Sequence, residues 1–502
     1  MFVREKANKS GKISVQVIDK STGKYKVVYT AGCSVDRNEI SKLHLKAKDW
    51  IKESQGVQEI DFSGTRDQLN NFLDGIESLN RVGYDLVLGK VFDEIGFNKI
   101  EDKIFRELVM ARIAFPKSKL KTIEYLYRYK QISWDEDQVY RYLDKLYNTQ
   151  KEIVQQISFE HTCKILNQDI SVVFYDVTTI YFEIDEEDNI RKTGFSKEGK
   201  HQNPQIILGL LVSRNGYPLA YEIFEGNKFE GHTMLPVVNA FKEKYQLSHL
   251  VIIADSGLLS RSNIEELQDK NYEFILGARI KNEPEIIKSK ILGLELKNGQ
   301  SSVVKKGELT LVITYSDSRA KKDAYNREKG IRKLEKLIRT GRLNKSNINN
   351  RGYNKFLKLE GEISVEIDRR KLENDKKWDG LKGYLTNAKM DKDQIIENYQ
   401  HLWQIEKAFR VSKSDLKIRP IYHRIQKRIE AHICINFVAY KVFKEIERQL
   451  QEKKAKISVN KAIEIAENIN EITVLNPTNK QKIKRTLLLT EEQKYLAKLF
   501  DF

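Results

Sequence analysis

The pattern of apolar and polar residues changes its period several times along the chain. Residues 1 to about 35 alternate with period two around the turn KSTGK, which predicts a basic β-hairpin. Helical periodicity follows at about 35–55 and 66–80, and it returns from about 101 to 157. The first third of the chain is therefore predicted to be a hairpin followed by helices.

Residues 121–148 contain two helical patterns separated by the short segment SWDED, in which Ser133 or Asp135 is a suitable N-cap. If the pair forms a helix-turn-helix, the candidate contacts to a DNA groove are Gln138, Arg141 and Lys145. A plain helical bundle explains the same pattern, so both interpretations stay open.

At residue 171 the pattern becomes that of a strand, SVVFYDVTTIYFE. Both of its faces are apolar, which is typical of a buried central strand, so the carboxylate of Asp176 needs compensation. Two more strands, QIILGLLVS and PLAYEIFEG, follow and are joined by a hairpin turn signal at 214–216. A helix, the strand HLVIIADSG with Asp255 near its end, another helix and the strand YEFILGAR complete the series.

This order predicts an α/β fold with a mixed sheet flanked by helices. Asp176 and Asp255 lie on the first and fourth strands. If those strands are neighbours, the two carboxylates approach each other at one edge of the sheet.

Residues 283–390 interrupt this pattern with short strands and a highly charged helix. From Arg319 to Arg351 the sequence has twelve Lys or Arg residues and three acids. Such an excess fits either a solvated helix or a surface that binds phosphates. Trp378 precedes the turn and strand with which this segment ends.

The stretch from Tyr399 to Tyr422 places a carboxylate within an apolar helical stripe. Residues recurring at three- and four-residue steps form this stripe, and Glu406 falls among them: Ile395, Ile396, Tyr399, Leu402, Trp403 and Phe409. Arg410 and Lys413 lie one and two turns beyond Glu406 on the same side. A core-facing helix with an ion pair between Glu406 and Arg410 is the simplest interpretation of this segment alone.

Composition limits the classes of function. The 502 residues include 88 Lys and Arg against 71 Asp and Glu, a formal charge of +17, which favours a polyanionic partner. The 3 cysteines are widely separated, which argues against a disulfide framework or a usual zinc site. No signal-like or long apolar stretch occurs, so we expect a cytoplasmic protein with no membrane partner.

Three acids therefore stand apart: Asp176, Asp255 and Glu406. Mg²⁺ and Mn²⁺ prefer oxygen ligands and Mg²⁺ usually keeps several waters, so a few converging carboxylates suffice for a site. Two such ions about 3.5–4 Å apart can activate an attacking oxygen and stabilise the leaving oxygen of a phosphodiester. With the positive net charge, this triad favours phosphoryl transfer on nucleic acid.

At these residues the chain resembles the DDE transposases of bacterial insertion sequences, which have a ribonuclease H-like core. The similar branch has a β-rich insertion before the Glu and a Tyr-x2-Arg-x3-Glu-x6-Lys signature, matched here by Tyr399, Glu406 and Lys413. Position 402 departs from the signature, because Leu402 stands where the family has Arg. YDVTT at 175–179 and ADSG at 254–257 are similar to the two Asp motifs of the family.

The resemblance implies that Asp176, Asp255 and Glu406 are the catalytic residues and also the ligands of two Mg²⁺ or Mn²⁺ ions. It implies cleavage of double-stranded DNA at terminal inverted repeats and strand transfer into target DNA by a homodimer in a synaptic complex. Lys413 and Tyr399 would contact the strand near the scissile phosphate, with Arg410 or Lys407 in place of the missing Arg. Trp378 would stack on an extruded base, unless it is a core residue.

The chain is thus predicted to have six segments: an N-terminal β-hairpin with helices that binds DNA ends (1–95), a helical segment with the helix-turn-helix candidate (96–165), the first part of a ribonuclease H-like core (166–282), the β-rich insertion (283–390), the second part of the core with the Glu helix (391–447), and a helical tail (448–502). Two alternatives to a transposase remain: a ribonuclease H-like nuclease that does not join strands, and a DNA-binding derivative that no longer reacts.

Overall fold

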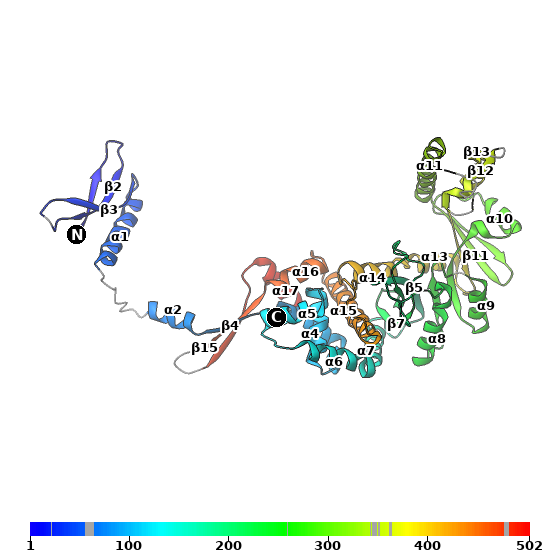
Figure 1. Ribbon diagram of the computed structural model, residues 1–502, viewed down its shortest axis with the longest axis horizontal. Helices are drawn as coiled ribbons and strands as arrows, with labels where there is room; N and C mark the ends of the chain where they lie inside the picture. Colours follow the sequence, from blue (N-terminus) through cyan, green and yellow to red (C-terminus); the bar gives the residue numbers. More distant parts are fainter. Residues whose placement is uncertain are drawn as a thin grey trace. The chain divides into compact units, whose positions relative to one another are not determined.

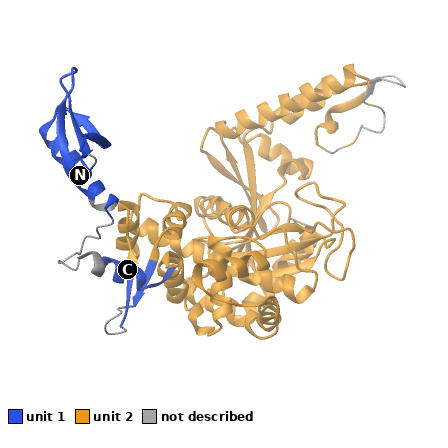
Figure 2. Cartoon of the chain, turned by 60° about the vertical axis from the view of Figure 1, so that its left-hand side comes forward, with its two compact units in different colours: residues 1–79, 471–485 blue, residues 80–470, 486–502 orange. Residues whose placement is uncertain are grey.

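The computed structural model describes residues 1–21, 23–55, 65–258, 260–341, 343, 349, 352–360, 364–475 and 481–502. They form two compact units, one of residues 1–79 and 471–485 and the other of residues 80–470 and 486–502 (Figure 2). No helix in the described ranges is both long enough and apolar enough to cross a membrane.

The smaller unit begins with a three-stranded antiparallel sheet made of β1 (Phe2–Ala7), β2 (Ile13–Asp19) and β3 (Lys26–Ser34). Alternate residues of β2, including Val15 and Val17, pack against α1 (Arg37–Ser54). The predicted hairpin is confirmed as β2 and β3, and β1 adds a third strand to it.

The tail contains strands as well as the predicted helices. A second three-stranded sheet has the order β16-β15-β4, formed by β4 (Ile76–Arg81), β15 (Asn470–Leu475) and β16 (Lys482–Leu487). The helices of the tail are α16 (Val459–Glu467) and α17 (Glu491–Phe500). The prediction of a helical tail was wrong for the segments that form β15 and β16. These strands form a sheet with β4, almost 400 residues earlier in the chain, and such a distant pairing leaves no local pattern in the sequence.

The larger unit is built on a mixed sheet whose first five strands in the chain are β5 (Val172–Tyr181), β6 (Gln205–Ser213), β7 (Pro218–Glu225), β8 (Val251–Ala254) and β9 (Glu273–Ala278). β5, β6 and β7 form an antiparallel meander, whereas β8 lies parallel to β5 and β9 parallel to β8. The spatial order β7-β6-β5-β8-β9 forms the predicted mixed sheet, and it makes β5 and β8 neighbours.

The predicted insertion extends this sheet. Its strands β10 (Ser301–Lys306), β11 (Leu309–Tyr315) and β14 (Leu381–Thr386) add to the edge at β9, and together they complete eight strands. The charged helix α11 (Asp317–Arg339) and a small ribbon project from this edge (Figure 1). The ribbon and the other helices of the insertion are α10 (Glu285–Leu292), β12 (Leu357–Glu360), β13 (Ser364–Ile367) and α12 (Arg369–Lys376).

Helices cover both faces of β5, which explains why both faces are apolar. Phe174 and Ile180 belong to one core, and Val173, Tyr175 and Val177 belong to the other. The second core is closed by α8 (Met234–Lys244) and α9 (Arg261–Asp269).

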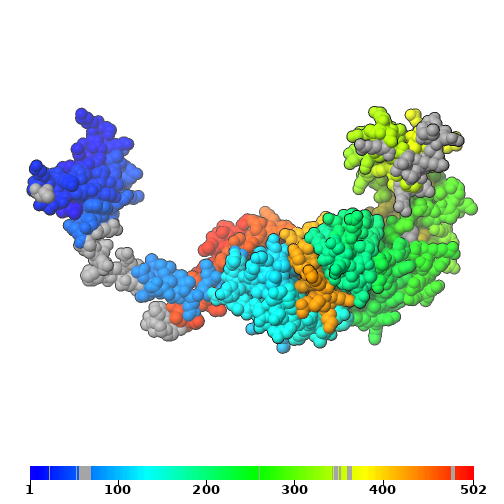
Figure 3. Space-filling model, in the orientation of Figure 1, coloured from blue at the N-terminus to red at the C-terminus, as the bar shows by residue number. Residues whose placement is uncertain are grey.

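The first core is closed by the long helix α15 (Gln426–Glu452), which lies between the N-terminal helices of this unit and the sheet (orange between cyan and green in Figure 3). Lys441 of α15 is fully buried and donates to the Ser158 carbonyl and the Thr162 hydroxyl, so it joins α15 to α7 (Lys151–Ile165).

The N-terminal helices of the larger unit are α3 (Lys90–Ile95), α4 (Lys103–Ala114), α5 (Lys119–Lys130) and α6 (Glu136–Lys145). Of the two predicted N-caps, Asp135 is the one that begins α6. Its carboxylate accepts from the Gln138 backbone N–H, and the Gln138 side chain accepts from the Asp135 N–H. This reciprocal capping box fixes the start of the second predicted helix.

Candidate active site

Asp176 lies on β5 and Asp255 directly follows β8, and these strands are neighbours, which is the condition under which we expected the two carboxylates to approach each other. β5 and β8 are parallel, and Tyr175 on β5 is paired with Ala254 on β8. Asp176 directly follows Tyr175 and Asp255 directly follows Ala254, so the two aspartates lie at the same level of the sheet. The Val177 N–H donates to Asp176 Oδ1 and the Gly257 N–H donates to Asp255 Oδ1, both at 2.7 Å. These bonds orient both carboxylates from their own backbones.

The carboxyl of Asp176 is difficult to ionise. Burial raises its pKa to about 7, Lys197 opposes this shift, and the negative charges of Asp255 and Glu230 add to it. The Lys197 ammonium lies 3.8 Å from Asp176 Oδ1 and 3.3 Å from Glu230, and it donates to the Val177 carbonyl. Lys197 thus supplies the compensation that a buried carboxylate needs, and no periodic pattern in the sequence pointed to it.

Glu406 lies on the exposed side of its helix, so the prediction that it faces the core was wrong. The stretch is two helices, α13 (Lys392–Gln400) and α14 (Trp403–Ser414), separated by a turn at 401–402. This turn shifts the phase of α14, so that Leu402 and Ile405 are buried while Trp403 and Glu406 are exposed. The described structure has no ion pair between Glu406 and Arg410.

Tyr399 is the residue around which the three acids gather. After burial, the charges of Asp255, Glu406 and Asp176 all contribute to raising the pKa of its phenol. Its hydroxyl lies against Gly277 on β9, where an added Cβ would be 2.5 Å from the oxygen. The chain therefore brings all three acids near one buried phenol, with a glycine making room for it.

Lys382 on β14 provides a cation at this place. Its ammonium lies 4.6 Å from the centre of the Tyr399 ring, a cation–π distance. Burial and Arg319 lower the pKa of Lys382, and the charge of Glu406 acts in the opposite direction. Leu402, at the position where the signature has Arg, is buried in the core instead. Sequence reasoning missed Lys382 because it lies 24 residues from Glu406 on a different element.

Lys413 reaches the same edge from the last turn of α14. Its ammonium donates to Thr178 Oγ1 at 2.6 Å and to Glu198 Oε1 at 2.8 Å. Burial and Lys197 lower the pKa of Lys413 to about 8, against the charge of Asp176. These contacts place Lys413 at the edge that carries Asp176, whereas the same position for Glu406 stays a prediction.

The donor set at this edge suits a hard divalent cation. Asp176 and Asp255 offer only oxygen atoms, and a cation between them would relieve the repulsion that raises the pKa of Asp176. Within the described residues, no three His, Cys, Asp or Glu side chains are grouped closely enough to hold a metal ion. The three acids therefore all act on Tyr399 without forming one compact cluster.

Sequence comparison identifies the domain that carries these residues. The profile of the family described as Transposase DDE domain matches residues 167–441, more than half of the chain. The chain belongs to this transposase family. Comparison with curated protein sequences gives no match.

Two kinds of solved transposase structure show similarity to the chain. One is a piggyBac transposase synaptic complex with hairpin DNA, 12% identical, which covers 80% of this chain and 79% of that chain with a TM-score of 0.40. The other is a Mos1 transposase paired-end complex with the left transposon end, 13% identical, which covers 37% of this chain and 56% of that chain with a TM-score of 0.16.

The other predicted DNA contacts of this transposase lie at three places. Arg410 is exposed on α14, whereas Lys407 is paired with Glu447. Trp378 is 9% exposed and packs within the core of the insertion, as the alternative interpretation proposed.

Gln138, Arg141 and Lys145 are exposed on α6, which packs against α15. The Gln138 side chain takes part in the capping box, and Lys145 pairs with Asp102 at 3.0 Å. Their role in a DNA groove stays a prediction.

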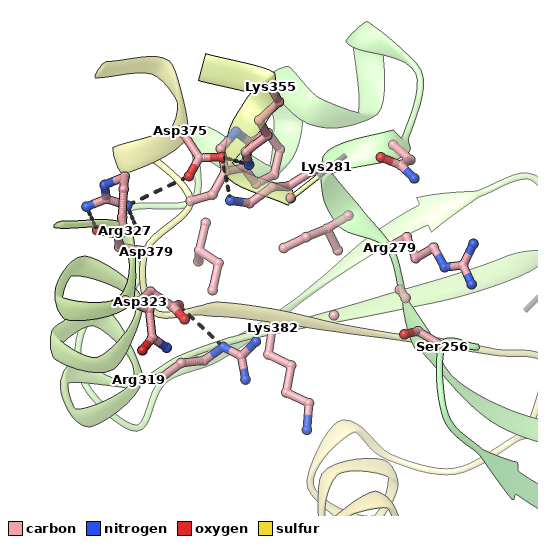
Figure 4. A pocket seen from close by; sticks show the side chains of 18 of the residues that line it. Ser256, Arg279, Lys281, Arg319, Asp323, Arg327, Lys355, Asp375, Asp379 and Lys382 are labelled. Carbon is pink, nitrogen blue, oxygen red and sulfur yellow. Dashed lines mark hydrogen bonds and ion pairs between the residues drawn. The ribbon is translucent and has the colours of Figure 1, made fainter. Parts of the chain in front are cut away.

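A pocket of about 690 Å³ is lined by residues of β9, β14 and α11 and by Ser256, the neighbour of Asp255 (Figure 4). Lys281 and Lys355 both pair with Asp375, at 2.9 and 2.8 Å, and Arg327 pairs with Asp379. Three labelled cations remain: Arg319 pairs with Asp323 at 3.7 Å, and Figure 4 shows no ion pair for Arg279 or Lys382.

Proposed function

We propose that this transposase cleaves DNA at the ends of a mobile element and joins the released 3′-hydroxyl to target DNA. The observation that carries the proposal is the register of β5 and β8, which places Asp176 beside Asp255 at one edge of a ribonuclease H-like sheet. Glu406 is the third acid, and its exposure on α14 leaves it open to a substrate. The substrates proposed are terminal inverted repeats and a target duplex, bound by two copies of the chain.

Asp176, Asp255 and Glu406 would hold one or two Mg²⁺ or Mn²⁺ ions. When bound, such ions lower the pKa of an attacking water and neutralise the charge on the phosphodiester oxygens. The chain itself orients the two aspartates through backbone N–H groups, and Lys197 offsets the charge of Asp176. Asp176 must lose its proton to act as a ligand, which the burial of its carboxyl opposes.

The strand near the scissile phosphate would be contacted by cations around Glu406. Arg410 is exposed beside it on α14, and Lys382 stands over the Tyr399 ring. Tyr399 is 6% exposed, so we propose that it acts on DNA chiefly by holding Lys382. Lys413, between Thr178 and Glu198, would fix the segment after β5 and contact DNA from there.

Cleavage of element ends tests this proposal. The substrate is a duplex containing the inverted repeat that flanks the gene, incubated with Mg²⁺. Asp176→Asn and Glu406→Gln should each abolish cleavage while DNA binding persists, because each removes one anionic ligand and leaves the basic surface unchanged. Glu397→Gln is the matched control: it removes an exposed carboxylate of α13 that pairs with Arg214, and it should leave cleavage intact. Full cleavage by both active-site variants would contradict the proposal.

Joining is tested separately with ends that have already been cleaved. A joined product with target plasmid distinguishes a transposase from a nuclease that only cuts. Cleavage without any joined product would restrict the function to that of a nuclease.

A further inference from the structure

A second pocket of the larger unit has a lining rich in positive charge. It lies where α5 begins, against the segment that follows α14, and its volume is about 450 Å³. Among the described residues, no Asp or Glu lines this pocket. Its cationic residues are Arg112, Lys117, Lys119, Lys121, Lys417 and Arg419.

Lys119 is the buried charge of this pocket. Its side chain belongs to a residue that is 5% exposed, and in the described chain no hydrogen-bond or ion-pair partner reaches its ammonium. Burial and the nearby Arg112 lower the pKa of Lys119 well below its usual range. A buried amine without a partner is costly, and a bound anion is the group that would compensate it.

The first turn of α5 adds backbone donors to the same place. Lys119 is the first residue of this 12-residue helix, and Ser118 is its N-cap, with the hydroxyl accepting from the Lys121 N–H. The free N–H groups and the dipole of a helix N-terminus attract anions. The buried ammonium and the helix end therefore favour the same kind of ligand.

Arg112 holds the two walls of the pocket together. It is 4% exposed, and its guanidinium donates to the Lys417 carbonyl at 3.3 Å and to the Lys117 carbonyl at 3.2 Å. Its Nε is buried without a partner. The walls that carry Lys117 and Lys417 are thus fixed before any ligand arrives, which lowers the entropy that binding must overcome.

Two histidines, His423 and His432, line the pocket. The rings of His423 and His432 are 5.8 Å apart, and His432 Nε2 is bonded to the Ile418 carbonyl at 2.8 Å. Burial, together with Lys119 and Arg428, lowers the pKa of His423 to about 3. Both histidines are neutral near pH 7.

A chain of contacts connects this pocket to the catalytic edge. Arg419 lines the pocket and pairs with Glu198, and Glu198 also binds the Lys413 ammonium. Lys413 in turn donates to Thr178, two residues from Asp176 on β5. A DNA strand that leaves the catalytic edge past Lys413 would therefore meet the wall formed by Arg419.

We propose that this pocket binds a phosphate group, and that in the working protein this group is a backbone phosphate of the DNA strand held at the catalytic edge. The phosphate chemistry follows from the pocket alone, whereas its source in DNA rests on the proposed function. A free phosphate ion or a nucleotide offers the same chemistry, and the two arms of the experiment separate these sources.

The first arm uses inorganic phosphate and the full-length protein. Phosphate should raise the midpoint of thermal unfolding relative to chloride at equal ionic strength, because it binds the folded state. Lys119→Met should raise the midpoint without phosphate, since it removes an unpartnered buried amine, and should lose the shift caused by phosphate. Lys270→Met, which removes an exposed lysine that pairs with Glu266 on α9, should keep that shift.

Two results of this arm would overturn the proposal: no stabilisation of the unaltered protein by phosphate, or an undiminished shift in Lys119→Met. If Lys119→Met does not fold, Lys417→Met takes its place. Lys417 is exposed, and it should lose part of the phosphate shift without loss of structure.

The second arm measures binding of the element-end duplex at several salt concentrations. Each lost phosphate contact should reduce the slope of log affinity against log salt by about 0.9. We expect this reduction in Lys119→Met and Lys417→Met and not in Lys270→Met. If phosphate stabilises the protein in the first arm but the salt slopes of the variants are unchanged, the pocket does not bind a DNA phosphate. The pocket would then be assigned to a free anion. Failure of cleavage by the unaltered protein, with both arms positive, would contradict the proposed function and leave the phosphate site standing.

Discussion

The two cationic pockets of the larger unit differ in how their charges are compensated. In the pocket beneath α11, Lys281 and Lys355 share Asp375, and Arg327 is held by Asp379. Each of these cations has a carboxylate within the same pocket. These ion pairs therefore stabilise the insertion, and the positive charge of each cation is already balanced by a carboxylate of the protein.

The pocket at the start of α5 has no such carboxylates among its described lining. Lys119 and Arg112 are more deeply buried than most cations of the other pocket, and yet they bind only backbone carbonyls or nothing. The comparison shows that a count of Lys and Arg does not identify a site for a polyanion. Buried cations without a carboxylate partner do identify such a site, because the free energy lost on desolvating them is offset only when an anion binds.

Removal of a compensated cation should have the largest effect on stability. Arg327→Met leaves Asp379 without its partner in a partly buried place, which should lower the free energy of unfolding by about 3 kcal/mol. Urea unfolding followed by circular dichroism and tryptophan fluorescence measures this change. Lys119→Met, at the uncompensated position, should change stability in the opposite direction. Equal losses in both variants would remove the distinction between the two pockets.

The uncompensated pocket should also respond to pH. The pKa of His423 is lowered from 6.5 to about 3 in the folded chain, so the unfolded chain binds more protons between these values. The contribution of the neutral His423 to the free energy of unfolding is therefore fully present above pH 6.5 and is lost as the pH falls toward 3. Between pH 7 and pH 5 the loss should be about 2 kcal/mol for this group.

His423→Gln should reduce this loss, while His432 keeps its own contribution. Besides burial, the nearby cations Lys119, Arg428 and Arg112 lower the pKa of His423, and of these Arg428 is itself paired with Asp144. The midpoint of urea unfolding at pH 5, 6 and 7 is the measurement. A pH profile that is the same in the variant and the unaltered chain would show that His423 is accessible to protons when folded.

The sequence was sufficient to predict the parts of the fold whose signal is local. The apolar faces of β5 and the order of the next four patterns led to the sheet, and with it to the meeting of Asp176 and Asp255. The prediction that Glu406 faces the core holds only for one continuous helix, whereas the stretch forms two. The turn at 401–402 breaks that periodicity and exposes Glu406.

The remaining parts of the site depend on contacts between distant segments. Lys197 reaches Asp176 from a connection between two strands, and Lys382 reaches Tyr399 from the insertion. The pocket of Lys119 needs residues near 420 to complete it, about 300 positions later in the chain. Such pairs have no periodic signal, so sequence patterns could not reveal them.

Lys382 is an exception to the difference between the two pockets. It lines the pocket whose cations are paired with carboxylates, but it has no ion pair there. It faces Tyr399 and the charge of Glu406 instead. Lys382→Met should therefore leave stability nearly unchanged and slow cleavage of element ends about tenfold, equivalent to about 1.4 kcal/mol in the barrier. Lys382→Arg should restore most of the rate, since it returns a cation to the same place. Lys281→Met, which breaks a compensated pair in the same pocket, should affect stability more than cleavage. The family signature has Arg where this chain has Leu402. An unchanged cleavage rate in Lys382→Met would mean that Lys382 on β14 does not take over the role of that Arg.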